Sequence, residues 1–147
     1  MIGSDSSFVI TNSGKIEFGN KNIISSNVQI YSSGILRLND HVNISEYSRV
    51  IAHEFISIGN NVTIAKFVTI LDHDHAYEIQ DEQLILTGYK VKPVTIGNNV
   101  WIGDKCTILR GVNIGNNVII GAHTLVNKDV PDNSMVAGIP FKVIRKL

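Results

Sequence analysis

Four consecutive residues, Asp72-His73-Asp74-His75, are the strongest candidates for chemistry in this sequence. A neutral imidazole can accept a proton at cellular pH. Transfer of an acyl group to a hydroxyl needs such a base, because an alcohol is a poor nucleophile until its proton is removed. A carboxylate or carbonyl beside the imidazole would fix its tautomer, as in a catalytic triad. Either histidine could be this base, and a solvated polar loop without chemistry is the alternative.

The other histidines do not suggest a metal site. His41 and His53 have no partners by sequence spacing, so we expect both to lie on the surface. His123 has Asn117 and Asp129 six residues before and after it, and neither is a histidine. Zinc requires three or four well-placed ligands. We therefore expect no catalytic metal.

A repeat of six residues must position these candidates, and it is clearest from Val94 to Val126. Its first positions are Val94, Val100, Cys106, Val112, Val118 and Thr124, and its third positions are Ile96, Ile102, Ile108, Ile114, Ile120 and Val126. A period of six is neither helical nor simply alternating, and it predicts a parallel β-helix. The two apolar positions lie on one strand face, which must be buried. The Gly-Asn-Asn that follows supplies the corner, because Gly and Asn tolerate positive φ.

The same period continues less regularly through residues 8–70. We expect two-residue phase slips, as widened corners, near Gly14–Lys15, Gly34 and Ala52–Glu54. The regular period returns from Ile58 to Ile70. The sequence therefore predicts five or six coils, with atypical repeats at the ends because terminal repeats cap the core.

Residues 71–93 are the one long interruption of the repeat, and we expect a loop that leaves the solenoid at one corner. Long loops in compact domains are usually functional or disordered. The loop contains two tyrosines and several aliphatic residues, which argue against disorder: Tyr77, Ile79, Leu84, Ile85 and Tyr89. We expect it to pack on a neighbouring surface, such as another subunit.

The end of the chain, residues 130–147, also leaves the repeat. Pro131, Gly138 and Pro140 break the pattern, and Phe141–Leu147 could form a strand or helical turn that covers the open end. At 147 residues the chain is then a single all-β domain, 1–147.

Trp101 and Cys106 are further candidates, and the repeat gives them opposite orientations. Trp101 lies between two inward positions and should point outward, as a wall for a ligand or a subunit contact, or as packing under the loop. Cys106 occupies an inward position. A buried, unpaired thiol is inert, so we expect a structural role for it.

Composition restricts the partners and the compartment. The chain has 13 basic and 13 acidic residues, which gives no electrostatic case for binding nucleic acid or an acidic membrane surface. The first residues lack the pattern of a signal peptide, and no apolar run approaches a membrane span. One cysteine excludes an internal disulfide and favours a cytoplasmic location.

Residues 55–147 resemble a known family of enzymes. The matching segments are Ile58–Ile70, the histidine-bearing loop, Pro93–Gly103, Gly121–Pro131 and Ala137–Arg145. Together they resemble the hexapeptide-repeat acyltransferases, in particular the galactoside and maltose O-acetyltransferases. They resemble even more the sugar acetyltransferases of capsule and lipopolysaccharide assembly, which often carry an Asp-His-x-His loop. The resemblance implies a left-handed parallel β-helix, although right-handed crossovers are the norm for parallel strands.

The resemblance also implies roles for individual residues. It makes His75, five residues after Ile70, the general base, with His73 as the second choice. Trp101 would shape the active-site pocket, and Tyr77 and Tyr89 are further candidates for substrate contacts. Acetyl-coenzyme A would lie between two subunits of a homotrimer, and the candidates for contacting it are Gly103, Asp104, Ala122, Asn127, Lys128, Lys142 and Arg145. The basic residues among them would meet its phosphates.

The function implied is transfer of an acetyl group from acetyl-coenzyme A to a sugar hydroxyl in surface polysaccharide biosynthesis. We expect direct attack without an acyl-enzyme, with a backbone amide near Gly103–Asp104 stabilising the oxyanion. Two alternatives stay open. One is an N-acetyltransferase for a nucleotide-linked amino sugar, and the other is a non-catalytic trimeric scaffold.

Overall fold

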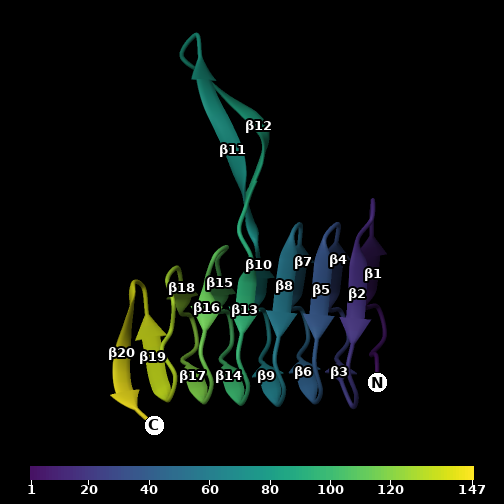
Figure 1. Cartoon of the computed structure of the whole chain (residues 1–147), viewed down its shortest axis with the longest axis vertical. Helices are drawn as coiled ribbons and strands as arrows, with labels where there is room; N and C mark the ends of the chain where they lie inside the picture. The colour runs from purple at the N-terminus through teal and green to yellow at the C-terminus, as the bar shows by residue number, and fades with distance from the viewer.

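The computed structural model describes all 147 residues and consists of strands and turns, with no helix. Its coils stack into a left-handed parallel β-helix of about six turns, as predicted (Figure 1). Three parallel sheets form the sides, and each coil contributes a strand to each of them in turn. Without a helix, the chain has no helical segment able to cross a membrane.

The strands of the three sheets have the following bounds. The six-stranded sheet contains β1 (Ser7–Ile10), β4 (Gln29–Ser32), β7 (Arg49–Ala52), β10 (Thr69–Leu71), β15 (Thr107–Ile108) and β18 (Leu125–Val126). The five-stranded sheet contains β2 (Lys15–Phe18), β5 (Ile35–Leu38), β8 (Phe55–Ile58), β13 (Val94–Ile96) and β16 (Asn113–Ile114). The seven-stranded sheet contains β3 (Ile23–Ile24), β6 (Val42–Ile44), β9 (Val62–Ile64), β14 (Val100–Ile102), β17 (Val118–Ile120), β19 (Ser134–Gly138) and β20 (Phe141–Lys146).

The inward residues of the strands form one continuous apolar core. On β14, Val100 and Ile102 are buried while Trp101 between them is exposed, as the repeat predicted. The core contains 29 buried residues drawn from every coil. Because one coil buries little by itself, each inward side chain depends on the coils above and below it.

The strand register confirms the predicted phase slips. In the first half of the solenoid, Ile35 of β5 pairs with Phe55 of β8, so a coil takes twenty residues. In the second half, Val100 pairs with Val118, so a coil takes eighteen. The two additional residues lie at the corner between the six-stranded and five-stranded sheets, near Gly34 and Ala52–Glu54. We call this corner the wide corner.

The Gly-Asn-Asn segments form the corner between the five-stranded and seven-stranded sheets. Asn61, Asn99 and Asn117 adopt positive φ there, between 55° and 56°. The side-chain oxygen of the preceding asparagine accepts a hydrogen bond from a backbone N–H of the previous coil. The N–H of Asn60 donates to Asn98 Oδ1, and the N–H of Asn98 donates to Asn116 Oδ1, both at 2.8 Å. The carboxamides therefore satisfy the backbone donors of this corner.

The interruption at residues 71–93 is a β-hairpin and not an irregular loop. β11 (His73–Gln80) and β12 (Gln83–Val91) pair antiparallel, and we call this hairpin the arm. Asp81 and Glu82 join the strands with φ of 49° and 62°, which matches the twist of a two-residue hairpin turn. Figure 1 shows the arm projecting away from the solenoid, beyond β10. The six-residue period does not predict these strands, because apolar residues on one face of the arm recur at every second position, as in Tyr77 and Ile79.

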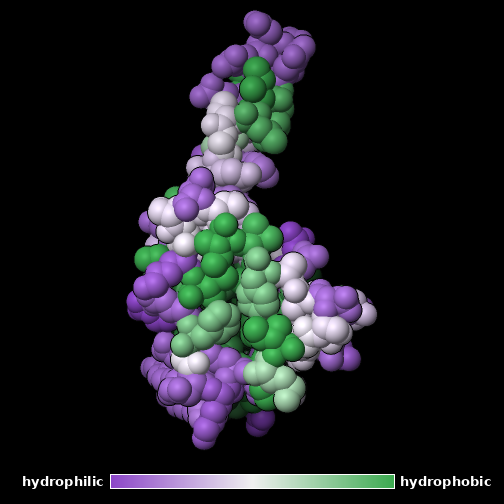
Figure 2. Space-filling model, turned by 90° about the vertical axis from the view of Figure 1, so that its right-hand side faces the viewer, coloured by the Kyte–Doolittle hydropathy of each residue, from purple (hydrophilic) through white to green (hydrophobic).

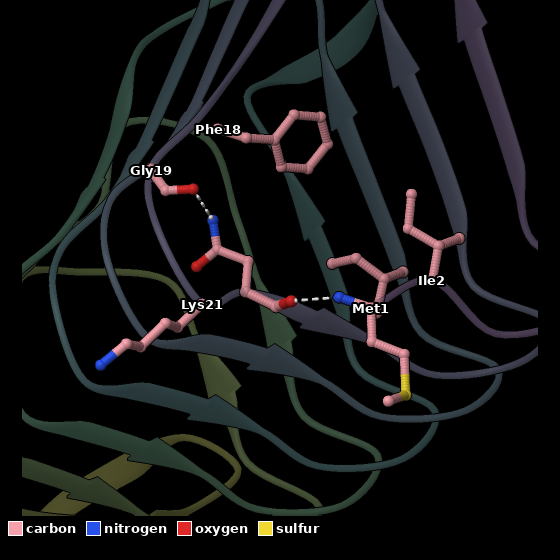
Figure 3. A pocket seen from close by; sticks show the side chains of 7 residues that line it. Met1, Ile2, Phe18, Gly19 and Lys21 are labelled. Carbon is pink, nitrogen blue, oxygen red and sulfur yellow. Dashed lines mark hydrogen bonds between the residues drawn. The ribbon is translucent and has the colours of Figure 1, made fainter.

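The two ends of the solenoid differ. At the C-terminal end, β20 folds back antiparallel onto β19, and Phe141 is buried in the core, which confirms the predicted cover in part. At the N-terminal end, a hollow is lined by Met1, Ile2, Phe18 and Ile24 among other residues (Figure 3). Figure 2, which views this end, shows apolar residues gathered across the body below the arm.

We predict that Ile64→Ala destabilises the chain by about 2–5 kcal/mol, because Ile64 is fully buried in the middle of the core and its truncation leaves a cavity between coils. Chemical denaturation measures this loss. Thr63→Ala is the matched control, since Thr63 is exposed on the same strand and its truncation should change stability by about 0.5 kcal/mol or less. Equal losses in both variants would contradict the burial pattern.

Candidate functional site

The arm leaves the solenoid at the wide corner, and a buried carboxylate holds its root. Asp72 is fully buried. Its two oxygens accept hydrogen bonds from the backbone N–H groups of His53, Glu54 and Phe55 at 2.8–2.9 Å. These donors belong to the preceding coil, so the first residue of the interruption ties the arm to the corner beneath it. Three donors compensate the burial of this carboxylate.

His73 is packed into the corner at the root of the arm. Its side chain is only 13% exposed, and its Nδ1 lies 3.6 Å from Asp72 Oδ1. That distance is too long for a hydrogen bond, so the buried Nδ1 has no partner. The His73 ring is stacked on the ring of His53, with 3.9 Å between centroids and 18° between planes. The expectation that His53 is a surface residue without partners was therefore wrong.

His53 connects the root of the arm to the coil below. Its ring lies 5.5 Å from that of Tyr31, whose hydroxyl forms a 2.8 Å hydrogen bond with Thr11 Oγ1. Burial lowers the pKa of His53 below its ordinary value of 6.5, and repulsion from His73 lowers it further. The His53 imidazole is therefore neutral at pH 7, and the stack does not place two cations face to face.

His75 lies one step further out on the arm and is exposed. Its ring packs at 4.8 Å from Tyr89, the residue opposite it on β12. The same Tyr89 ring meets His53 at 4.5 Å and His73 at 5.3 Å, edge-on to both. Tyr89 therefore contacts all three imidazoles, of which His53 and His73 are partly buried and His75 is exposed.

The arm carries these histidines on its apolar face. Cross-strand partners share a face of a hairpin, and the pairs beyond His75 and Tyr89 are Tyr77 with Leu86 and Ile79 with Leu84. These four side chains are 56–64% exposed, so nothing in the chain covers them. The opposite face carries Asp74, which forms a 2.6 Å ion pair with Arg110 at the root of the arm.

A second group of candidates lies on the seven-stranded sheet. Trp101, Gly103, Asp104 and Ala122 line one hollow together with Met135 of β19. Trp101 is 55% exposed, so it does not pack under the arm. On β20, Arg145 pairs with Met135, which lines the hollow, and Lys142 pairs with Ala137 further along β19. Gly103, Asp104 and Ala122 are thus the expected coenzyme contacts that line the hollow.

The backbone at this hollow has free donors. The N–H of Gly103 donates to the carbonyl of Ile120 at 2.8 Å, whereas those of Asp104 and Ala122 donate no hydrogen bond within the chain. Asp104 Oδ1 accepts from the N–H of Lys66 in the coil below at 3.0 Å. Ala122, at the same position in the next coil, has no side-chain oxygen that could accept a hydrogen bond from the N–H of Asp104. Two exposed amides are therefore available to a ligand.

Three other candidates lie outside this hollow. Asn127 and Lys128 are exposed after β18, and Lys128 Nζ lies 5.0 Å above the ring of Phe141. Cys106 is buried, as predicted, and its Sγ donates to the carbonyl of Gly121 at 3.0 Å. Burial raises the pKa of this thiol, which keeps it protonated and unreactive.

The histidines and the hollow are not assembled into one site within a single chain. The histidines belong to the arm and the wide corner, whereas the hollow lies on the seven-stranded sheet, and no pocket is lined by residues of both. The contacts of His53 and Tyr31 and the hydrogen bonds of Asp72 were not predicted from the sequence. His53 precedes His73 by twenty residues, which is the length of one coil here. The predicted two-residue phase slips, which lengthen a coil from eighteen to twenty residues, could therefore have indicated this contact.

Comparison with protein families supports an acyltransferase fold. The family model described as bacterial transferase hexapeptide (six repeats) matches residues 93–128. Among curated proteins, WbbJ of Escherichia coli K12 is 31% identical over 93% of this chain and 74% of its own length. Its assignment as a lipopolysaccharide biosynthesis O-acetyl transferase is provisional.

Two further matches concern galactoside acetylation. The galactoside O-acetyltransferase of Escherichia coli K12 is 42% identical over 63% of this chain, which spans 44% of that enzyme. A solved galactoside acetyltransferase in complex with coenzyme A superposes with a TM-score of 0.77 at 31% identity, covering 95% of this chain and 65% of the other. The chain thus spans about half to three quarters of the relatives that it matches.

We predict that Asp72→Ala destabilises the root of the arm by about 2 kcal/mol or more, because three N–H groups lose their acceptor. Amide hydrogen exchange should show faster exchange at His53, Glu54 and Phe55. Asp74→Ala is the control, since it removes one exposed ion pair worth about 1 kcal/mol or less. Unchanged protection of the three amides would contradict this role of Asp72.

Proposed function

Because this chain belongs to the hexapeptide-repeat acyltransferases, we propose that it transfers the acetyl group of acetyl-coenzyme A to a sugar hydroxyl in surface polysaccharide biosynthesis. The observation that carries the proposal is the arm. It presents an open imidazole, His75, on a strand that is fixed at its root by Asp72 and packed against Tyr89. The similarity to WbbJ and to the galactoside enzyme supports a sugar acceptor.

His75 is the proposed general base, because it is the exposed member of the histidine pair. It accepts the proton of the acceptor hydroxyl, and the oxygen attacks the carbonyl carbon of the thioester. The tetrahedral intermediate collapses with cleavage of the carbon–sulfur bond. The proton on His75 then passes to the departing thiolate, so that the base is regenerated and no acyl-enzyme forms.

The free amides at the hollow are the proposed contacts for the coenzyme and the oxyanion. The N–H of Asp104 is available to stabilise the oxyanion, whereas that of Gly103 is already used within the chain. The N–H of Ala122, together with Arg145 and Lys142, is available for the rest of acetyl-coenzyme A. Trp101 forms a wall of the same hollow. Asn127 and Lys128 lie farther away and remain candidates from the family resemblance alone.

A homotrimer would complete the site. The chain by itself separates His75 from the hollow, and the arm exposes an apolar face that continues from the histidines. Packing of this face against the next subunit would bury that apolar surface. It would also bring His75 of one chain towards Trp101 and Asp104 of another.

His75→Ala should lower turnover by roughly two to four orders of magnitude, the usual contribution of a positioned base. The assay follows thiol release from acetyl-coenzyme A with a panel of neutral sugars, amino sugars and nucleotide sugars. A fully active His75→Ala variant beside an inactive His73→Ala variant would move the role of base to His73. His41→Asn is a control that removes an exposed imidazole elsewhere.

The panel also tests the acceptor class. Thiol release with neutral sugars supports O-acetylation, and release only with amino sugars would replace it with N-acetylation. Calorimetry with coenzyme A provides the remaining check. Failure both to bind coenzyme A and to release thiol would contradict an acetyl-transfer function and favour a scaffold.

Leu86→Asp should dissociate the trimer into monomers, because it places a charge on the apolar face of the arm. Ile85→Lys is the control on the opposite face, since Ile85 pairs with Glu78 and the added charge stays in water beside an opposite charge. Sedimentation equilibrium measures the mass of both variants. Trimers in both, or monomers in the unmodified protein, would contradict the proposed assembly.

A further inference from the structure

We propose that His53 is a positioning residue for the acetyl-transfer reaction, acting on His75 through His73 and Tyr89. The proposal deepens the proposed function and rests on it, because it concerns the orientation of the proposed base. His53 belongs to the coil before the arm, and it lies next to His73 because one coil here takes twenty residues. The contacts of its ring give it this role.

A continuous series of ring contacts leads from the N-terminal coils to His75. Tyr31 is fixed by its hydrogen bond to Thr11, and its ring contacts His53 at 5.5 Å. His53 stacks on His73 at 3.9 Å, and Tyr89 closes against both rings. The outer side of the Tyr89 ring then packs on His75 at 4.8 Å. Each ring is therefore held by the one before it, and the open imidazole is the last.

The root of the arm depends on few contacts apart from these rings. They are the bonds of Asp72 to the preceding coil, the backbone hydrogen bonds of Lys92 N–H to the Asp72 carbonyl and of Gly111 N–H to the Lys92 carbonyl, and the exposed ion pair between Asp74 and Arg110. An isolated two-stranded hairpin is marginally stable in water. The direction in which the arm leaves the corner, and with it the position of His75, is therefore sensitive to the loss of one ring.

The side chain of His53 has a geometric role and not a proton-transfer role in this arrangement. Its ring is covered by His73 on a face and by Tyr89 at an edge, and Tyr31 lies beyond it. His73 fills the space between His53 and the arm, and its Nδ1 has no partner that would hold the ring by itself. The flat face of His53 is thus the surface that keeps His73, and hence Tyr89, in place. An aromatic side chain without nitrogen can supply the same face.

His53→Ala should lower kcat by about 10- to 100-fold, the range expected when a catalytic group is displaced by about 1 Å. The KM for acetyl-coenzyme A should stay within about two-fold, because the hollow on the seven-stranded sheet is untouched. His53→Phe restores the flat face and should recover most of kcat. His41→Asn, which removes an exposed imidazole at another corner, should leave both constants unchanged.

Two results would overturn the proposal. Full activity of His53→Ala would show that the stack does not position the base. Loss of activity in a folded His53→Phe variant equal to that in His53→Ala would show that the His53 nitrogens act directly. Thermal denaturation of both variants shows whether a loss of activity comes from unfolding. If His53→Phe is unfolded, His53→Tyr, which also carries an aromatic ring, takes its place in the comparison with His53→Ala.

Nuclear magnetic resonance of the histidine side chains tests the stack without an activity assay. In the unmodified protein the ring protons of His73 should be shifted upfield by the faces of its neighbours. That shift should fall in His53→Ala and persist in His53→Phe. This result, together with failure both to bind coenzyme A and to release thiol, would contradict the proposed function and leave the stack as a structural contact. No change of the His73 signals in His53→Ala would contradict the stack itself.

Discussion

Burial of the inward Ile and Val column is the constraint on which the structure depends. Each strand contributes at most two buried side chains, so no coil is stable without its neighbours. Stacking also requires that every corner turn within a few residues, which is why left-handed backbone conformations recur at each coil. Asn61, Asn99 and Asn117 adopt this conformation readily. Tyr47 and Phe67 adopt it at the cost of strain, and their rings stack at 5.1 Å.

The arm exists because the wide corner accepts additional residues without disturbing the core. The coils at this corner already contain two more residues than those of the second half, and the arm extends the same corner in the next coil. Asp72 makes the extension compatible with the solenoid, since its carboxylate takes over the N–H groups of the corner below. The histidines follow directly in the sequence, and Asp72 and the stacked rings connect them to the solenoid.

Two corners built from the same repeat differ in their backbone donors. Where Asn98 and Asn116 stand, each carboxamide accepts from the coil below, and the corner is closed to ligands. At the corner after β14 and β17, the Asp104 carboxylate accepts a hydrogen bond from the backbone N–H of Lys66 in the same way. Ala122, the corresponding residue of the next coil, has no side-chain oxygen to accept from the N–H of Asp104. A change from a polar to an apolar side chain therefore opens a donor on the outside of the solenoid.

The six-residue period by itself determined the solenoid, the inward and outward positions, the corners and the burial of Cys106, because burial on one strand face imposes that period on the sequence. It also marked residues 71–93 as the interruption that carries the candidate base. The hairpin, the bonds of Asp72 and the stack of His53 on His73 were decided by the tertiary structure. The contacts of Asp72 and His53 join residues that are 17 to 20 positions apart in the sequence. Which residues meet depends on the number of residues at the wide corner, and that number is fixed by how the coil closes in three dimensions. The separation of His75 from Trp101 likewise follows from which side of the prism each residue occupies, and a linear sequence does not express that distance.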